Sequence, residues 1–293
     1  MNDAGTVTRK VDRVNSKTWR GPDSQVDNKA MIIAPGDFLN TEPFLVLGEN
    51  WFSSPGFEWH PHRGFETVTM VLDGVLEHGD SLGNTGTLEP GDLQWMTAGS
   101  GILHRELAFR NEHAHILQLW VNLPKNEKMT ATRYQDLRAR DHALVDHPGV
   151  KVQVISGTSD GVTGPAANHW PIIGMLITLD PNITYAVRLP AQDRAFAYAM
   201  EGAAAIGGRN VQEGEVAWSD PVRSMYGSSL ELQTRDGDNR TKVLLFSGEP
   251  IGEPIYAGGP FVMTSREEIE KAFYDLHSGK FGPIPRAARL LTR

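Results

Sequence analysis

Cysteine is absent from this sequence of 293 residues. Its absence excludes disulfide bonds, iron–sulfur clusters, cysteine nucleophiles and thiolate ligands to a metal. Any metal ion that the protein binds must therefore be held by nitrogen and oxygen atoms.

Basic side chains are also scarce. The chain has 28 Lys and Arg against 36 Asp and Glu, which gives a formal net charge of −8 at pH 7. Binding to a phosphate backbone requires a concentrated basic face. The modest cluster of Arg133, Arg138 and Arg140 is diluted by Asp136 and Asp141. We therefore expect no direct binding to nucleic acid.

Long apolar runs are missing as well. No window approaches the 18 consecutive apolar residues of a membrane-spanning helix. Residues 1–21 lack the apolar core of a signal peptide. The sequence therefore predicts a cytoplasmic protein without a membrane span.

Short β-type runs separated by turns fill most of the chain. FETVTMVLDGVL at 65–76 and HILQLWVNLP at 115–124 are rich in apolar and β-branched residues. Turn sequences such as Asp73-Gly74 and EPGD at 89–92 lie between such runs. This pattern predicts an all-β fold of antiparallel strands, arranged as a sandwich or a barrel.

The chain also repeats itself. MVLDG and LEPGDLQWM, at 70–74 and 88–96, have counterparts in YAMEG and VQEGEVAWS, at 198–202 and 211–219. The interval between the two motifs is shorter in the second copy, as the loss of a loop would produce. We interpret this as one β-unit duplicated in tandem. The polar segment 125–148 is interpreted as the connection, which predicts domains at 1–135 and 136–293.

A short helix is predicted near the C-terminus. Ser265 and Glu268 have the spacing of a capping box. Four apolar residues then fall on one face of the helix: Ile269, Ala272, Phe273 and Leu276. We expect this face to pack against a sheet.

Two histidines stand one residue apart, at His60 and His62, before a run that is typical of a strand. Side chains alternate along a strand with period two, so we expect His60, His62, Gly64 and Glu66 to share a face. Two imidazoles and a carboxylate that point into one cavity favour a metal site, because neutral imidazole is a common ligand of first-row metals.

A second pair, His104 and Glu106, has the same spacing and follows the turn Gly99-Ser100-Gly101. Together the two pairs offer three nitrogen ligands and one oxygen ligand. This set suits one mononuclear ion with open positions, which is Fe(II), Mn, Ni, Cu or Zn by ligand type. A closed structural zinc site is not expected without thiolates.

The sequence alone leaves the roles of other candidate residues open. His78, Gln94 and Met96 either line the same cavity or belong to the core. His113 and His115 form another His-x-His, but no partner follows at a matching distance, and we do not expect them to bind the metal.

The motifs resemble those of the cupin superfamily: H-x-H-x3-E at His60, His62 and Glu66, then G-x-G-x-x-H ending at His104. Longer segments are similar to the pirin family within it, and they cover nearly the whole chain. These segments are HPHRGFETVTMVLDG at 60–74, DSLGNTG at 80–86, PGDLQWMTAGSGILHRE at 90–106, LQLWVNLP at 117–124 and GGPFVM at 258–263.

The resemblance implies two tandem cupin-type antiparallel β-barrels, a bicupin, with one metal ion in the N-terminal barrel and none in the degenerate C-terminal barrel. The ligands of the family fall on His60, His62, His104 and Glu106, and the metal is usually iron. Glu66, a ligand position in many other cupins, is implied to lie behind the ligands. Segment 189–202 has no histidine.

The resemblance also implies two functions. Some pirins open flavonols such as quercetin with O2 and release carbon monoxide, which predicts a quercetin 2,3-dioxygenase in which Glu106 or Glu66 accepts the substrate proton. Other pirins regulate transcription factors or metabolic enzymes as protein partners, with iron as a redox-sensitive switch. A third interpretation is that the protein is an enzyme that acts on an unrelated substrate.

We expect a monomer, because two tandem barrels already cover the face that dimeric cupins bury.

Overall fold

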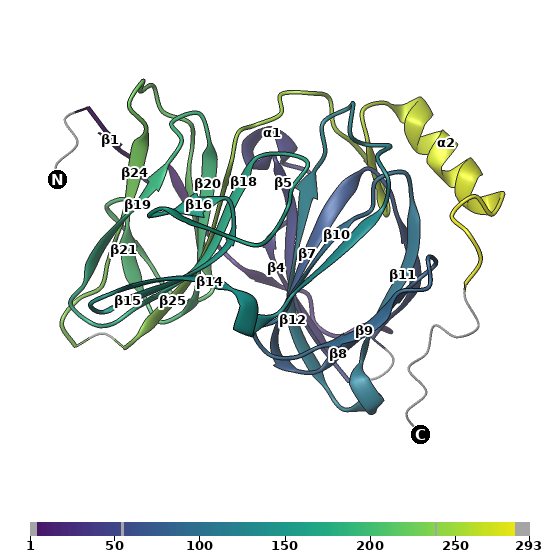
Figure 1. Ribbon diagram of the computed structural model, residues 1–293, viewed down its shortest axis with the longest axis horizontal. Coiled ribbons are helices and arrows are strands. Elements are labelled where there is room, and N and C mark those ends of the chain that lie inside the picture. Colours follow the sequence, from purple (N-terminus) through teal and green to yellow (C-terminus); the bar gives the residue numbers. More distant parts are fainter. Residues whose placement is uncertain (1–4, 54–55, 238, 285–293) are drawn as a thin grey trace. The chain divides into compact units, whose positions relative to one another are not determined.

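The computed structural model describes residues 5–53, 56–237 and 239–284. The chain forms two compact units (Figure 1). We call Thr18–Arg140 with Ile251–Arg293 the first barrel, and Met1–Lys17 with Asp141–Pro250 the second barrel. Each unit is built from two principal β-sheets, so the predicted all-β class is confirmed.

The first barrel has a seven-stranded and a four-stranded sheet. The order of the larger sheet is β13 (Arg133–Leu137), β10 (Leu93–Thr97), β7 (Phe65–Gly74), β12 (Ala114–Asn122), β5 (Phe44–Phe52), β4 (Asn28–Ile33) and β3 (Thr18–Trp19). The order of the smaller sheet is β6 (Phe57–His62), β11 (Ile102–Ala108), β8 (Leu76–Asp80) and β9 (Thr85–Leu88). All the strand pairs in both sheets are antiparallel.

The second barrel has a seven-stranded and a five-stranded sheet. The order of the larger sheet is β14 (Ala143–His147), β15 (Val150–Ser156), β18 (Ile172–Leu179), β25 (Thr241–Gly248), β20 (Arg194–Glu201), β23 (Glu215–Ser219) and β2 (Arg13–Ser16). The other sheet contains β1 (Val7–Thr8), β24 (Ser228–Gln233), β21 (Ala204–Ile206), β22 (Arg209–Val211) and β19 (Thr184–Leu189). A small hairpin joins β16 (Thr158–Ser159) to β17 (Val162–Thr163).

The two barrels repeat one topology. The order β10, β7, β12, β5, β4 in the first barrel corresponds to β23, β20, β25, β18, β15 in the second. The register agrees as well, because Met70 pairs with Leu93 and the corresponding Tyr198 pairs with Val216. The shorter interval in the second copy is explained by the hairpin of β21 and β22, which is tighter than that of β8 and β9.

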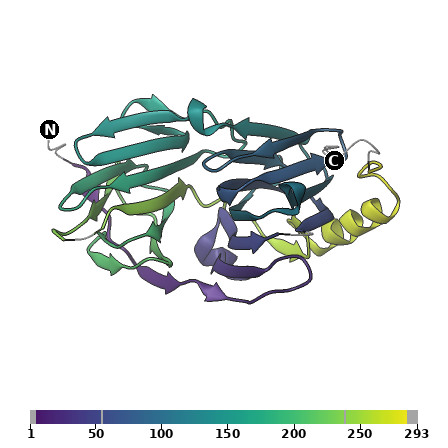
Figure 2. The same ribbon diagram turned by 90° about the horizontal axis from the view of Figure 1, so that it is seen from below.

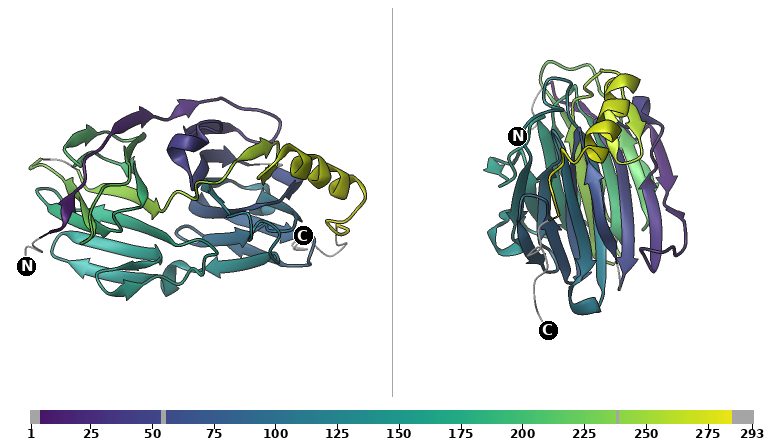
Figure 3. Two further views of the ribbon diagram at one scale, coloured as in Figure 1. Left: turned by 90° about the horizontal axis from the view of Figure 1, so that it is seen from above. Right: turned by 90° about the vertical axis from the view of Figure 1, so that its right-hand side faces the viewer.

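The two chain termini do not follow the predicted division at residue 135. The N-terminal strand β2 pairs with β23 in the second barrel (Figure 2). The side chain of Arg9 is buried there and donates to the carbonyl oxygens of Pro190 and Asp193. The C-terminal segment belongs to the first barrel (Figure 3). The contacts between strands, and not the order of the chain, therefore set the limits of each unit.

The C-terminal segment consists of a hairpin and the predicted helix. Strand β26 (Tyr256–Gly258) pairs with β27 (Phe261–Met263), and α2 (Arg266–His277) follows. The side chain of Ser265 accepts a hydrogen bond from the backbone N–H of Glu268, as the capping box predicts. The expected apolar face is confirmed, because Ala272 is buried in a cluster with Phe261 and Phe281.

Other helical segments are short. They are α1 (Phe38–Thr41) and single 3-10 turns at Phe109–Asn111 and Ala139–Asp141. None of the helices in the described ranges is long and apolar enough to span a bilayer.

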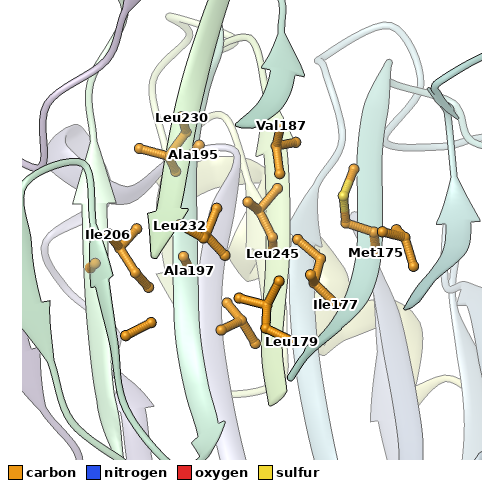
Figure 4. Close-up of a cluster of buried hydrophobic side chains, with 14 of the residues drawn as sticks. Met175, Ile177, Leu179, Val187, Ala195, Ala197, Ile206, Leu230, Leu232 and Leu245 are labelled. Carbon is orange, nitrogen blue, oxygen red and sulfur yellow. The ribbon is translucent and has the colours of Figure 1, made fainter. Parts of the chain in front are cut away.

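The interior of the second barrel is apolar. Side chains from both of its sheets meet there, including Leu230 and Leu232 of β24 and Leu245 of β25 (Figure 4). Burial of this apolar surface stabilises the unit. The interior of the first barrel is different, because polar side chains occupy much of it.

Candidate metal centre

The two histidines of the first pair lie on β6, which ends at His62. The chain then turns at Arg63-Gly64, and β7 begins at Phe65 in the other sheet. Gly64 has a φ of +85°, and a Cβ atom there would lie 2.0 Å from the carbonyl oxygen of Val262. The expected common face from His60 to Glu66 is therefore wrong, because the strand does not continue through the turn.

The strand register brings the third histidine to the first two. His104 of β11 pairs directly with His60 of β6. One nitrogen of each of His60, His62 and His104 lies within 4.8 Å of the others. Ring centroids are 4.3 Å apart for His60 and His104, and 4.9 Å apart for His62 and His104. A cross-strand pair and a neighbour two residues away thus form one cluster.

Backbone carbonyl groups orient two of these rings. Nδ1 of His60 donates to the carbonyl oxygen of Glu58 at 2.7 Å, and Nδ1 of His62 donates to that of Pro260 at 3.4 Å. Because a carbonyl only accepts, Nδ1 carries the proton, and Nε2 of each ring keeps a lone pair. This is the arrangement in which ligating histidines are commonly held.

The remaining nitrogen atoms suit a metal ion. Among the described residues, Nε2 of His62 and both ring nitrogens of His104 are buried without a hydrogen-bond partner. Burial lowers the pKa of His60, and it lowers the pKa of His62 and His104 well below the usual value, with a further contribution from the neighbouring imidazoles. Neutral imidazoles with available lone pairs fit the ligand set of a first-row metal.

Glu106 lies in the same interior. It is 1% exposed and follows a β-bulge after His104. Its Oε1 accepts from Oγ1 of Thr69 at 2.9 Å, and its Oε2 accepts from Nε2 of Gln118 at 2.6 Å. The three-histidine group does not include a Glu106 oxygen. Glu106 nevertheless follows His104 by two residues on β11, and its negative charge opposes the lowering of the pKa of His60.

Glu66 faces the other way. The register of β7 is regular from Glu66 to Met70, so Glu66 and Thr69 point to opposite sides of the sheet. Its Oε1 accepts from Oγ1 of Thr97 at 2.6 Å. Since Thr69 is the residue that contacts Glu106, the geometry favours Glu106 over Glu66 as the carboxylate of the site.

The other residues that the sequence suggested fall into two groups, one inside the first barrel and one away from the metal centre. His78 is 2% exposed and pairs across the strands with Glu106, and Gln94 shares the inner face with Thr69. His113 and His115 lie elsewhere, because their Nε2 atoms are 3.0 Å from Asp73 and Glu49.

Several residues of the inner face were not predicted as site residues from the sequence, among them Thr69, Gln118, Tyr134 and Asp136. For Thr69 and Gln118 the signal was a polar side chain inside an otherwise apolar strand, as in TVTMV and ILQLW. Tyr134 and Asp136 lie on the mostly polar strand RYQDL, which gave no such signal. Which neighbours such residues meet depends on pairing between strands that are distant in the sequence, so no local pattern identified them.

The C-terminal segment holds the turn that follows His62. The backbone N–H of Val262 donates to the carbonyl oxygen of Arg63, and Nη1 of Arg63 lies 3.0 Å from Oδ2 of Asp275 on α2. Nζ of Lys128 donates to the carbonyl oxygens of Gly64 and Val262. The turn is thereby fixed to β27 and α2.

The second barrel has apolar residues where the first has this polar cluster. Matching the strand registers gives the following counterparts: Val187 for His60, Leu189 for His62, Leu230 for His104, Leu232 for Glu106, Ala197 for Thr69 and Leu245 for Gln118. These side chains carry no metal-binding atom. The polar interior is therefore a property of the first barrel.

Comparison with known proteins agrees with this architecture. The family model "Pirin" matches residues 34–121, and the model "Pirin C-terminal cupin domain" matches residues 174–282. The human protein named Pirin is 40% identical over 248 residues, which are 84% of this chain and 85% of that protein. A Pseudomonas aeruginosa protein is 42% identical over 233 residues, which are 77% of this chain and 79% of that protein. That protein is provisionally named a quercetin 2,3-dioxygenase.

A solved structure has the same architecture. A quercetin 2,3-dioxygenase from Acinetobacter baumannii is 31% identical and superposes with a TM-score of 0.84, covering 95% of this chain and all of that one (100%). The predicted pair of cupin-type barrels with a C-terminal helix is thus confirmed, and so is the resemblance in sequence. The chain belongs to the pirin family.

Proposed function

We propose that this protein is a metal-dependent dioxygenase that opens flavonols such as quercetin with O2. One divalent ion, Fe(II), would be held by His60, His62, His104 and Glu106. The observation that carries the proposal is the cluster of three neutral imidazoles, with ligand atoms within 4.8 Å of one another, in a polar barrel interior. The names of the relatives from Pseudomonas and Acinetobacter support this reaction class.

When bound, such an ion supplies Lewis acidity, which lowers the pKa of a coordinated hydroxyl group. In this proposal Glu106 would hold the proton that the flavonol hydroxyl releases. Each of its carboxylate oxygens accepts one hydrogen bond, from Thr69 or Gln118, and each keeps a further lone pair.

Aromatic walls limit the access of water to His62, whereas His60 is partly exposed. Phe65 and Trp120 lie against His62, with ring centroids 5.0 and 5.3 Å from that of the imidazole. Their stacked rings cover one side of the cluster. A site with little water strengthens every charge interaction within it.

The test is O2 uptake and carbon monoxide release with quercetin, on protein whose metal has been quantified. His62→Ala should abolish metal-dependent turnover. His113→Ala is the matched control and should keep it, because His113 is exposed and bonded to Asp73. Absence of turnover by the wild type at full iron occupancy would contradict the proposed reaction.

A further inference from the structure

Two stacked rings connect the sheets of the first barrel. Tyr134 lies on β13 of the seven-stranded sheet, and His78 lies on β8 of the four-stranded sheet. Their ring centroids are 5.6 Å apart, and the ring planes differ by 17°. The two side chains therefore meet in the interior of the barrel.

The polar atoms of this pair are buried and make no hydrogen bonds among the described residues, although His78 lies at ion-pair distance from Asp136. The hydroxyl of Tyr134 and both ring nitrogens of His78 have no hydrogen bond within the described part of the chain. Oδ1 of Asp136 is 3.8 Å from Nε2 of His78, which is too long for a hydrogen bond. Buried polar atoms without partners destabilise a fold unless a bound molecule supplies the missing bond.

The pair adjoins the metal centre. His78 is the cross-strand partner of Glu106. Burial raises the pKa of Tyr134 well above its usual value, and the charges of Asp80, Glu106 and Asp136 raise it further. The phenol is therefore a neutral donor whose hydroxyl lies within the field of the Glu106 carboxylate.

The surroundings of His78 leave space for its ring. Gly86 pairs with His78 across β8 and β9, and a Cβ atom at Gly86 would lie 2.7 Å from Nε2 of His78. Any other residue at this position would displace the imidazole. In the second barrel the counterpart of His78 is Ile206, which is buried in the apolar core.

The inner face of the sheet beside Tyr134 combines apolar and polar side chains. The strand registers place Met96, Thr67 and Trp120 in one row with Tyr134 across four neighbouring strands. This row combines two aromatic side chains and a thioether with two hydroxyl groups. Such a surface contacts an aromatic body and leaves its polar substituents for the hydroxyl and imidazole groups.

We propose that Tyr134 and His78 form a binding site for the substrate itself, a planar hydroxylated aromatic compound. The Tyr134 hydroxyl donates to an oxygen of the ligand, and a ring nitrogen of His78 pairs with a ligand hydroxyl. This inference deepens the proposed function and rests on it for the choice of ligand. It concerns binding, and not the chemical step.

The test is an anaerobic titration with quercetin, followed by absorbance, on protein with quantified metal. Tyr134→Phe keeps the aromatic ring and removes only the hydroxyl, and His78→Phe replaces the imidazole with a phenyl ring that has no polar atom. We expect each variant to bind quercetin about three- to tenfold more weakly. The ligand-free Tyr134→Phe protein should be as stable as the wild type or more stable. Tyr274→Phe, an exposed tyrosine on α2, is the control and should bind as the wild type does.

Unchanged affinity in both variants would overturn the proposal. So would weaker binding that only follows a loss of metal or of folded protein, and so would a wild type that does not bind quercetin. Because the titration needs no turnover, binding that these variants weaken supports the proposal even if no O2 is consumed. Turnover with unchanged affinity in the variants would leave the dioxygenase intact and reject this site.

Discussion

In the first barrel, hydrogen bonds to backbone carbonyl groups and from neighbouring donors orient the side chains of the metal centre. His60 and His62 each use Nδ1 for a carbonyl group, which directs the lone pair of Nε2 toward the cluster. Glu106 is fixed by Thr69 and Gln118 in the same way. Small changes in these partners should therefore alter metal affinity more than stability.

The two candidate carboxylates can be separated by one matched pair of variants. Glu106→Gln removes the charge that faces the histidines, and we expect metal affinity to fall by at least about tenfold. Glu66→Gln should leave the metal affinity unchanged, because Glu66 points to the other face of β7. A competition titration with a chelator and metal analysis of the purified proteins measure both. Equal losses in the two variants would reject the choice of Glu106.

Among the structural elements, the C-terminal segment contacts the site although it is distant in the sequence. Pro260 is 198 positions from His62, and its carbonyl oxygen accepts the hydrogen bond from that ring. The pair of Arg63 and Asp275 is only 5% exposed on each side and joins α2 to the turn after β6. The helix is therefore part of the support of the metal centre.

Asp275→Asn should weaken this attachment in a pH-dependent manner. Hydrogen bonds from Lys280 and Arg63 lower the pKa of Asp275 below its usual range. Its folded pKa is thus lower than its unfolded pKa, so its contribution to stability is present above about pH 4 and is lost as the pH falls further. Thermal unfolding should show the largest difference from the wild type at pH 7 and a much smaller one near pH 2.

The matched control for this variant is Glu270→Gln, an exposed carboxylate on the same helix. It should unfold as the wild type does at both pH values. Hydrogen exchange at pH 7 should be faster in α2 of Asp275→Asn only. A difference from the wild type that does not change with pH would show that the Asp275 charge is not responsible.

At the scale of the whole molecule, one topology was used for two different interiors. The second barrel is filled by apolar side chains such as Leu230, Leu232 and Leu245, and these form its core. The first barrel gives up part of that apolar burial to place polar groups inside. A bound ion would compensate by stabilising the folded form of that barrel.

Removal of metal should therefore destabilise one barrel and not the other. At a free metal concentration about a thousand times Kd, the ion adds about 4 kcal/mol to the free energy of unfolding. Hydrogen exchange measured with and without metal should show lost protection in β6, β11 and their neighbours, and none in β18, β20 or β25. Equal loss of protection in both barrels would contradict this division.

The sequence by itself determined what depends on neighbouring residues. Alternating apolar residues and turn motifs specified short antiparallel strands, and Ser265 with Glu268 specified the start of α2. The spacing of His60 with His62 and of His104 with Glu106 was enough to predict a metal site, and the cluster of three histidines agrees with it. The duplicated motifs likewise predicted the repeated topology.

The tertiary structure decided everything that depends on pairing across the chain. Only the pairing of strands shows that β6 and β7 lie in different sheets, which separates Glu66 from the histidines. Only packing shows that β1 and β2 belong to the second barrel and that α2 belongs to the first. The reason is physical: strand pairing joins backbone groups that are far apart in the sequence, and no local pattern of residues records which strand will be the partner.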